Sequence, residues 1–228
     1  MPDEPAGGAT EALLRGLDAA QVRAVTTDAS PLAVIAAAGS GKTTVLTRRI
    51  AHRILTESAA PRHVLALTFT RDAAGELKRR LRRFDLRTPV EAGTFHAVAL
   101  RLLRDRAEAA GQAPPQVATD RLRLVREVLT ELRLRADATA VAADIDWARA
   151  RLVAPSEFER AVRSARRRSS VPAARLGDIV AAYEQLKRRR GVVDFDDLLE
   201  RVAVALETDP AWADAVRWRV RHRFVGEA

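Results

Sequence analysis

One stretch near the N-terminus constrains the fold more than any other. Residues 34–44 contain an apolar run, a small-residue loop and then Gly-Lys-Thr at the start of an amphipathic pattern. Gly39 and Gly41 allow a tight turn that brings backbone N–H groups close to phosphate oxygens. The helix that begins near Lys42 adds the positive end of its dipole. The segment therefore predicts a strand, a phosphate-binding loop and a helix.

The residues around the second glycine supply the chemistry of such a loop. Lys42 can reach the β- and γ-phosphates of a nucleotide, and the Thr43 hydroxyl can bind Mg²⁺. Ala36 stands where the usual pattern begins with glycine. The alternative is a strand-turn-helix unit in which the glycines serve geometry alone. The residues expected at the nucleotide are Ala38, Gly39, Ser40, Gly41, Lys42, Thr43 and Thr44.

Composition limits the class of protein. The 228 residues are 47% hydrophobic and 30% charged, which indicates a globular chain with one sizeable core or two small ones. No apolar run approaches the length of a membrane span, and residues 1–10 have no signal-peptide core. The sequence has no cysteine, which excludes disulfides and cysteine-bound metals. We expect a cytoplasmic protein without membrane contact.

The charge balance points to a polyanionic partner. The formal net charge is +9, and nucleic acid is the first candidate for such a basic chain. A coding bias towards arginine and alanine would give the same balance. Charge alone therefore leaves both explanations open.

Alternating apolar strands and amphipathic helices predict a parallel, doubly wound α/β sheet. The expected strands cover residues 31–37, 64–68, 90–92 and 222–225. Residues 120–190 have helical periodicity and no clear strand, which predicts a helical insertion within the α/β domain.

The same pattern predicts four segments along the chain. Residues 1–10 are expected to be disordered because they contain proline, glycine and acids without periodicity. Residues 11–110 should form the first part of the α/β domain, and residues 111–190 the helical insertion. Residues 191–228 should return to the α/β domain.

Polar and aromatic residues follow two of the expected strands. Ligands bind at the carboxyl edge of open α/β sheets. Hydroxyls and helix N-termini there could hold nucleic-acid phosphates, and Phe69 could stack on a base. The alternative is ordinary helix caps with a core phenylalanine, and a capping or packed His96. The candidate nucleic-acid residues are Thr68, Phe69, Thr70, Arg71, Gly93, Thr94, Phe95 and His96.

Two further segments carry weaker signals. The amide of Gln21 has a donor side and an acceptor side that match the N6 and N7 edge of adenine, although a surface glutamine is the more common explanation. The acid-rich segment that begins at Asp194 precedes a helix. A metal site there is conceivable, but capping and dipole stabilisation better explain Asp194 and Asp197.

Together these segments resemble the UvrD/Rep/PcrA family of superfamily 1 DNA helicases. The motif around Gln21, A-x-x-G-S-G-K-T, L-T-F-T-x-x-A-A, G-T-F-H and D-F-D-D-L-L stand in the family's order over residues 11–228. The resemblance implies a RecA-like P-loop NTPase parallel sheet. It also implies that residues 111–190 are the family's inserted all-helical subdomain.

The resemblance also implies an activity and the roles of individual residues. It implies an ATP-dependent helicase that moves 3′ to 5′ on single-stranded DNA, acts at single-strand/duplex junctions and uses ATP and Mg²⁺. Gln21 would read adenine, the loop with Lys42 would hold the triphosphate, and Thr43 would bind Mg²⁺. The candidate nucleic-acid residues would contact single-stranded DNA or couple to it.

The last segment departs from the family pattern. The family has an apolar strand followed by Asp-Glu, in which the Asp holds the Mg²⁺ network and the Glu is the general base. Here Glu227 aligns with the base, and Gly226 stands at the Asp position. Because glycine has no side-chain oxygen, Mg²⁺ would be held less well.

Two functions therefore stay open. The first is the N-terminal portion of a helicase, ending inside its Walker B motif and inactive by itself. The second is a non-catalytic ATP- and DNA-binding module with a degenerate, truncated Walker B motif. A P-loop kinase or transporter ATPase would leave the other four motifs as coincidences.

Overall fold

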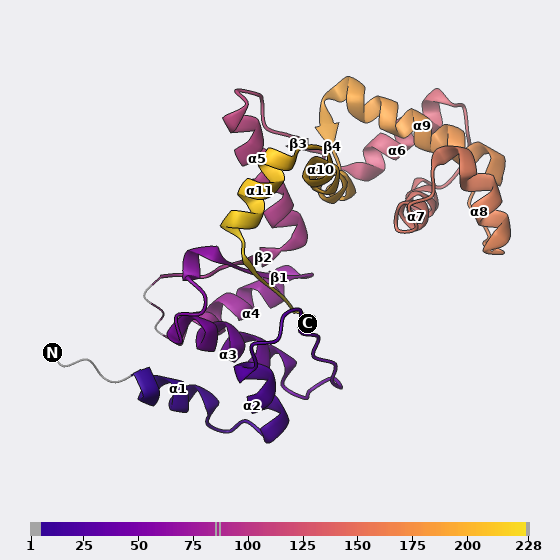
Figure 1. The fold of residues 1–228 in the computed structure, drawn as a ribbon. Helices are drawn as coiled ribbons and strands as arrows, with labels where there is room; N and C mark the ends of the chain where they lie inside the picture. The colour runs from indigo at the N-terminus through magenta and orange to yellow at the C-terminus, as the bar shows by residue number, and fades with distance from the viewer. Residues whose placement is uncertain (1–5, 85, 87, 227–228) are drawn as a thin grey trace. The chain divides into compact units, whose positions relative to one another are not determined.

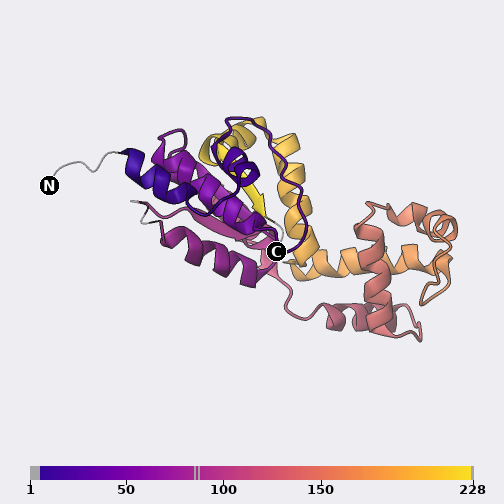
Figure 2. The same ribbon diagram turned by 90° about the horizontal axis from the view of Figure 1, so that it is seen from below.

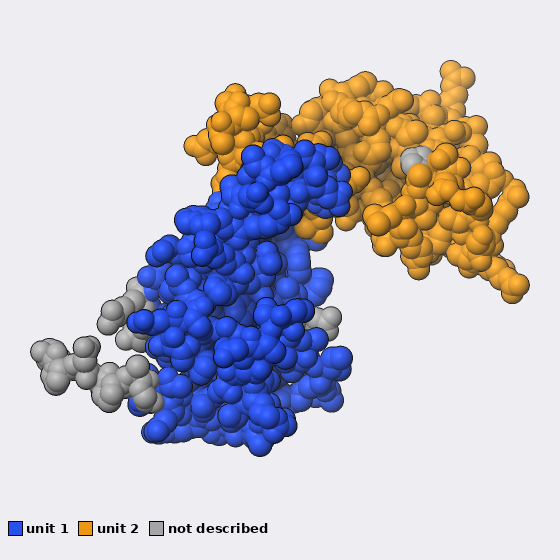
Figure 3. Space-filling view, in the orientation of Figure 1, with its two compact units in different colours: residues 1–98, 203–228 blue, residues 99–202 orange. Residues whose placement is uncertain are grey.

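The chain forms two compact units, shown in Figure 3. Unit 1 contains residues 1–98 and 203–228, and unit 2 contains residues 99–202. The structure, a computed structural model, describes residues 6–84, 86 and 88–226.

Unit 1 contains a small parallel sheet. Its strands are β1 (Val64–Thr68), β2 (Glu91–Thr94) and β5 (His222–Gly226). Their order is β2-β1-β5, and both neighbours run parallel to β1. Thr68 stands in register with Thr94 on one side and Gly226 on the other, so the three carboxyl ends meet at one edge. The parallel arrangement is confirmed, and β2 lies slightly later in the sequence than predicted.

Helix α3 is the centre of unit 1. It packs against α1, α2, α4 and β5 (Figures 1 and 2). Ile50 of α3 is fully buried with Ala66 of β1 and Leu77 of α4. The helix that follows the glycine loop is therefore part of the hydrophobic core. The helices of this unit are α1 (Ala6–Leu14), α2 (Ala19–Thr26), α3 (Lys42–Leu55), the 3₁₀ turn η1 (Pro61–His63), α4 (Arg71–Arg82), the start of α5 (Phe95–Ala109), the end of α10 (Phe195–Thr208) and α11 (Pro210–Arg219).

The prediction of a strand over residues 31–37 is wrong. Residues 32–37 have no strand or helix, and the side chain of Ile35 is 96% exposed. A β-branched apolar run fits a strand only when a neighbour pairs with it and covers its face. In the described part of the chain, the sheet contains β2, β1 and β5 and does not include this segment.

Residues 6–10, which belong to the segment expected to be disordered, begin α1 in the structure. Residues 1–5 lie outside the described residues. Helix α1 forms because it packs on α3: Leu13 is buried, and Arg48 of α3 donates a hydrogen bond to the Leu13 carbonyl at 2.9 Å. Tertiary contact therefore supplies the order that the local composition does not indicate.

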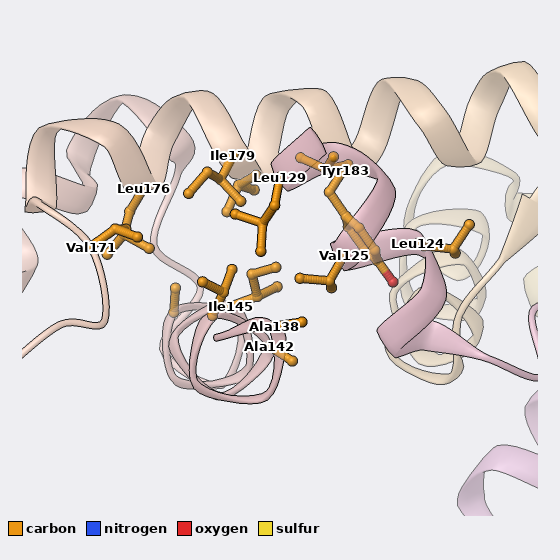
Figure 4. Close-up of a cluster of buried hydrophobic side chains, with 14 of the residues drawn as sticks. Leu124, Val125, Leu129, Ala138, Ala142, Ile145, Val171, Leu176, Ile179 and Tyr183 are labelled. Atoms are coloured by element: carbon orange, nitrogen blue, oxygen red, sulfur yellow. The ribbon is translucent and has the colours of Figure 1, made fainter. Parts of the chain in front are cut away.

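Unit 2 consists mainly of helices. Val125, Ile145, Ile179 and Tyr183 are fully buried in its core, and Figure 4 shows them gathered between α6, α7 and α9. The elements of this unit are the end of α5, β3 (Gln116–Val117), α6 (Arg121–Glu131), α7 (Ala138–Arg149), the 3₁₀ turn η2 (Pro155–Glu157), α8 (Phe158–Ser164), α9 (Ala173–Arg190), β4 (Val192–Val193) and the start of α10.

Unit 2 covers residues 99–202, and the helical insertion expected over residues 111–190 lies within it. Ala99 of α5 and Leu198 of α10 pack together with Val193 of β4. Strand β4 pairs in parallel with β3. Two-residue strands are too short to give a periodic signal, so the sequence pattern did not reveal this second small sheet.

The acid-rich segment before α10 is a helix cap and an ion-pair cluster. Asp194 Oδ1 accepts from the backbone N–H of Asp197 at 3.0 Å, and Asp197 Oδ2 accepts from that of Asp194 at 2.8 Å. Lys187 Nζ donates to Asp197 at 2.6 and 2.7 Å and to Asp194 at 3.1 Å, while Arg149 contacts both carboxylates. Capping is confirmed, and the described residues contain no group of metal-ligating side chains.

This cluster predicts how stability depends on pH. Burial raises the pKa of Asp194, but Arg149, the Asp197 N–H and Lys187 outweigh burial and hold it well below its usual range. An aspartate in an unfolded chain has a pKa of about 3.9. The contribution of Asp194 should therefore be complete above about pH 4 and lost as the pH falls towards its folded pKa.

Urea unfolding followed by circular dichroism between about pH 2 and 7 measures this effect. Asp194→Asn should be less stable at neutral pH and should lose less stability on acidification than the parent chain. Parallel pH profiles for the two proteins would contradict the role of Asp194.

Candidate nucleotide and nucleic-acid site

The glycine loop has the geometry of an anion-binding turn. Gly39 and Gly41 have φ angles of 76° and 85°, in the left-handed region that favours glycine. The N–H of Ser40 donates to the Ala37 carbonyl at 3.3 Å and closes the turn. Gly41 is the N-cap of α3 and provides no side-chain cap. The first backbone N–H groups of α3 are therefore not used by a capping side chain and can face an anion.

Lys42 lies over this loop. Its Nζ donates to the carbonyls of Ala36 and Ala37, both at 2.9 Å. An ammonium group has three donors, so the side chain is held at the loop with one donor remaining. Thr43 follows in the first turn of α3, and the Thr44 hydroxyl accepts from Arg80 Nη1 of α4 at 3.2 Å.

Gln21 lies beside the loop although it is distant in sequence. Its Nε2 donates to the Ser40 carbonyl at 3.1 Å, and its Oε1 accepts from the Asp18 N–H at 3.1 Å. A Cβ on Gly41 would lie 3.2 Å from Gln21 Nε2, so the glycine permits this close approach. One donor and one acceptor position of the amide remain for a ligand.

The structure also gives Gln21 a role that the sequence analysis missed. Asp18 is the N-cap of α2, and its carboxylate accepts from the backbone N–H of Gln21 at 2.8 Å. Together with the Asp18 N–H bond to Gln21 this forms a reciprocal capping box. The spacing of an acid and a glutamine three residues later was the available signal.

The aromatic residues at the strand ends lie together. Phe69 follows β1 and Phe95 follows β2, with ring centroids 5.1 Å apart and planes inclined by 38°. Phe69 is 61% exposed, so the alternative of a core phenylalanine does not describe it. His96 is half-buried in the first turn of α5, and Arg71 is exposed at the start of α4.

The threonines at this edge have structural partners. Thr70 and Thr94 each accept from the backbone N–H three residues later, at 3.1 and 3.2 Å, and so stabilise the starts of α4 and α5. Thr68 is 3% exposed, and Gly93 is buried within β2. Among the candidate nucleic-acid residues, Phe69, Thr70 and Arg71 are exposed, while Thr68, Gly93 and Thr94 are buried at the same edge.

Gly226 ends the described part of β5. A Cβ at this position would lie 2.7 Å from Leu46 Cδ2 on α3, which is closer than carbon atoms approach. A side chain at 226 therefore requires Leu46 to move. Glu227 lies outside the described residues, so its role as a general base stays a prediction.

A glycine loop at the start of a helix, beside a parallel sheet, is the arrangement of phosphate-loop α/β proteins. The chain belongs to the UvrD/REP helicase N-terminal domain family, whose family model matches residues 17–228. The small parallel sheet and the many helices agree with such a domain.

Several bacterial helicases are similar over most of this chain. "ATP-dependent DNA helicase UvrD2" of Mycobacterium tuberculosis is 38% identical over 96% of the chain and 33% of that protein. "ATP-dependent DNA helicase PcrA" of Leuconostoc citreum is 33% identical over 83% of the chain and 26% of that protein. "ATP-dependent DNA helicase UvrD1" of Mycobacterium leprae is 32% identical over 94% and 28%, respectively. The chain thus spans a third or less of these relatives.

No helix in the described residues is both long enough and apolar enough to cross a membrane.

The contact between Gly226 and Leu46 can be tested by mutation. Gly226→Ala should destabilise the protein by about 0.5–1.5 kcal/mol, because the added methyl group overlaps Cδ2 of Leu46 and forces that side chain to shift. Most of this loss should disappear when Leu46 is replaced by alanine in both backgrounds, and thermal unfolding of the four proteins measures it.

Gly75→Ala is the matched control. Its Cβ would have no neighbour closer than 4.0 Å, and alanine favours a helix interior by about 0.5–1 kcal/mol. If Gly226→Ala lowers the stability equally in the parent chain and in the Leu46→Ala background, the overlap with Leu46 is not the cause.

Proposed function

We propose that this chain is the N-terminal motor portion of an ATP-dependent DNA helicase, with a RecA-like arrangement. It would couple ATP hydrolysis to 3′-to-5′ movement on single-stranded DNA and to opening of single-strand/duplex junctions. The observation that carries the proposal is the hydrogen bond of Gln21 to the phosphate loop at Ser40. It brings an adenine-reading amide and a phosphate cradle together.

In the proposed nucleotide site, the loop N–H groups and Lys42 bind the phosphates, and Gln21 reads adenine. Lys42 would exchange its bonds to the Ala36 and Ala37 carbonyls for phosphate oxygens. Family membership and the relatives named as ATP-dependent helicases support ATP as the nucleotide.

The residues present fit Mg²⁺ through a single side chain. The Thr43 hydroxyl would hold the ion together with phosphate oxygens and water, as Mg²⁺ sites in nucleotide enzymes commonly do. Gly226 provides no side-chain oxygen, and Leu46 occupies the space beside it. When bound, Mg²⁺ would neutralise charge on the triphosphate. Thr43 would hold the ion beside the loop.

We propose that single-stranded DNA binds along the carboxyl edge of β1 and β2. Phe69 would stack on a base, and Arg71 would contact a phosphate. Phe95 would support the Phe69 ring, and His96 would lie beside it. The net charge of +9 favours such a partner.

Gly226 and its contact with Leu46 favour a second candidate, a non-catalytic ATP- and DNA-binding module. The two functions differ in turnover. A helicase portion predicts phosphate release stimulated by single-stranded DNA in the full-length protein, and a binding module predicts none. Lys42 and Gln21 would serve nucleotide binding in both.

The nucleotide site predicts the effect of removing the loop lysine. Lys42→Ala should weaken binding of a fluorescent ATP analogue about ten- to a hundredfold, because a charge-assisted hydrogen bond to phosphate is lost. Lys78→Ala removes the same charge from an exposed position on α4 and should leave the affinity unchanged. Similar affinities of the two variants would contradict the role of Lys42.

The nucleic-acid edge predicts the effect of removing its exposed ring. Phe69→Ala should weaken binding of a single-stranded oligonucleotide by about 1–3 kcal/mol, measured by fluorescence anisotropy. Binding should also weaken with salt, because phosphate contacts release counterions. Trp218→Ala removes another exposed aromatic of unit 1 and is the control. An equal effect of both substitutions would argue against stacking at Phe69.

A further inference from the structure

A buried arginine joins α2 to the helix that follows the phosphate loop. Arg49 of α3 is 8% exposed. Its Nη1 donates to the carbonyls of Ala24 and Thr27, both at 2.8 Å, and of Val25 at 3.4 Å. Its Nη2 donates to the Ala29 carbonyl at 3.1 Å. One side chain thus holds the end of α2 and the segment after it.

The chemistry of these acceptors suits a guanidinium group. The last carbonyls of a helix have no partner within the helix and carry the negative end of its dipole. A planar guanidinium with five N–H donors can satisfy several of them at once, whereas an ammonium has three donors at a single nitrogen. Burial and then Arg53 lower the pKa of Arg49, while Asp28 opposes this. Arginine nevertheless stays charged in proteins.

Helix α2 is held at both ends. Gln21 is in its first turn, where it contacts the Ser40 carbonyl. The other end of this short helix is held by Arg49, seven residues along α3 from Lys42. The phosphate loop leads directly into α3, and Arg49 lies on α3, so one rigid helix connects them. The position of α2 on α3 therefore sets the distance between Gln21 and the loop.

Arg48 has a separate task. Its Nη1 donates to the carbonyls of Leu13 and Arg15, at the end of α1 and in the turn after it. These two bonds hold the segment that precedes α2. The two neighbouring arginines therefore provide a matched pair for comparison.

We propose that Arg49 is a positioning residue for nucleotide selectivity: by fixing α2 on α3, it holds Gln21 where its amide distinguishes adenine from guanine. This inference rests on the proposed nucleotide site. The phosphate loop binds every nucleoside triphosphate alike, and only the base edge differs. Adenine presents N6–H₂ beside N7, whereas guanine presents the O6 acceptor there. A displaced amide loses this discrimination and leaves phosphate binding in place.

Competition binding tests the proposal. ATP and GTP each displace a fluorescent nucleotide from the parent chain, Gln21→Ala, Arg49→Met and the double variant. The parent should prefer ATP by about 5- to 150-fold, the range for a bidentate contact. Arg49→Met should lose most of this preference. In the Gln21→Ala background, Arg49→Met should change it no further.

The ratio of the two affinities separates positioning from general destabilisation. Partial unfolding lowers the apparent affinity for ATP and GTP by the same factor, so the ratio does not change. Arg48→Met should keep the parental ratio. Should Arg49→Met fail to fold, Arg49→Lys replaces it, and we expect this variant also to lose preference because its ammonium group cannot reach all four carbonyls.

Two results would overturn the proposal, and they differ in what else fails. If Arg49→Met or Arg49→Lys keeps the parental ratio while Gln21→Ala loses it, Arg49 is only a structural residue and the nucleotide site stands. If the parent shows no preference for ATP, or Gln21→Ala keeps it, the assignment of Gln21 fails as well.

Discussion

Unit 1 depends on the packing of one helix, α3. Its N-terminus carries the glycine loop, its apolar face is buried against β1 and α4, and its arginines bind backbone carbonyls of the N-terminal segment. Arg48 and Arg49 together hold carbonyls from the end of α1 to the segment after α2. A buried guanidinium is stable only when its donors are satisfied. The position of the glutamine helix beside the phosphate loop is therefore a consequence of helix-end chemistry.

Unit 2 depends on a different constraint, the buried charges where α9 meets α10. Lys187 and Arg149 neutralise Asp194 and Asp197, and the two carboxylates also cap the first turn of α10. The pair of short strands β3 and β4 lies just before this cap. Asp194 and Asp197 of the D-F-D-D segment thus join α9 to α10 through hydrogen bonds and ion pairs within the protein.

The proposed site has its glycine loop and glutamine together and departs from the family pattern at Gly226. The loop, Lys42 and Gln21 are assembled as a nucleotide site requires, and Phe69 stands exposed at the neighbouring strand ends. At Gly226 the missing carboxylate coincides with a close approach of Leu46. The proposed nucleotide contacts and the position that departs from the family pattern therefore lie on different parts of the chain.

The sequence by itself determined the features that depend on near neighbours: the glycine turn, the cap at Asp194, the amphipathic helices, and β1 with its apolar run. These follow from local hydrogen bonds and periodicity. Only the tertiary structure decided which apolar segments became strands, because a strand needs a partner, and residues 31–37 remain unpaired while shorter segments pair as β3 and β4. It also placed Gln21 on Ser40 and Leu46 against Gly226, since contacts between residues distant in the chain leave no periodic signal.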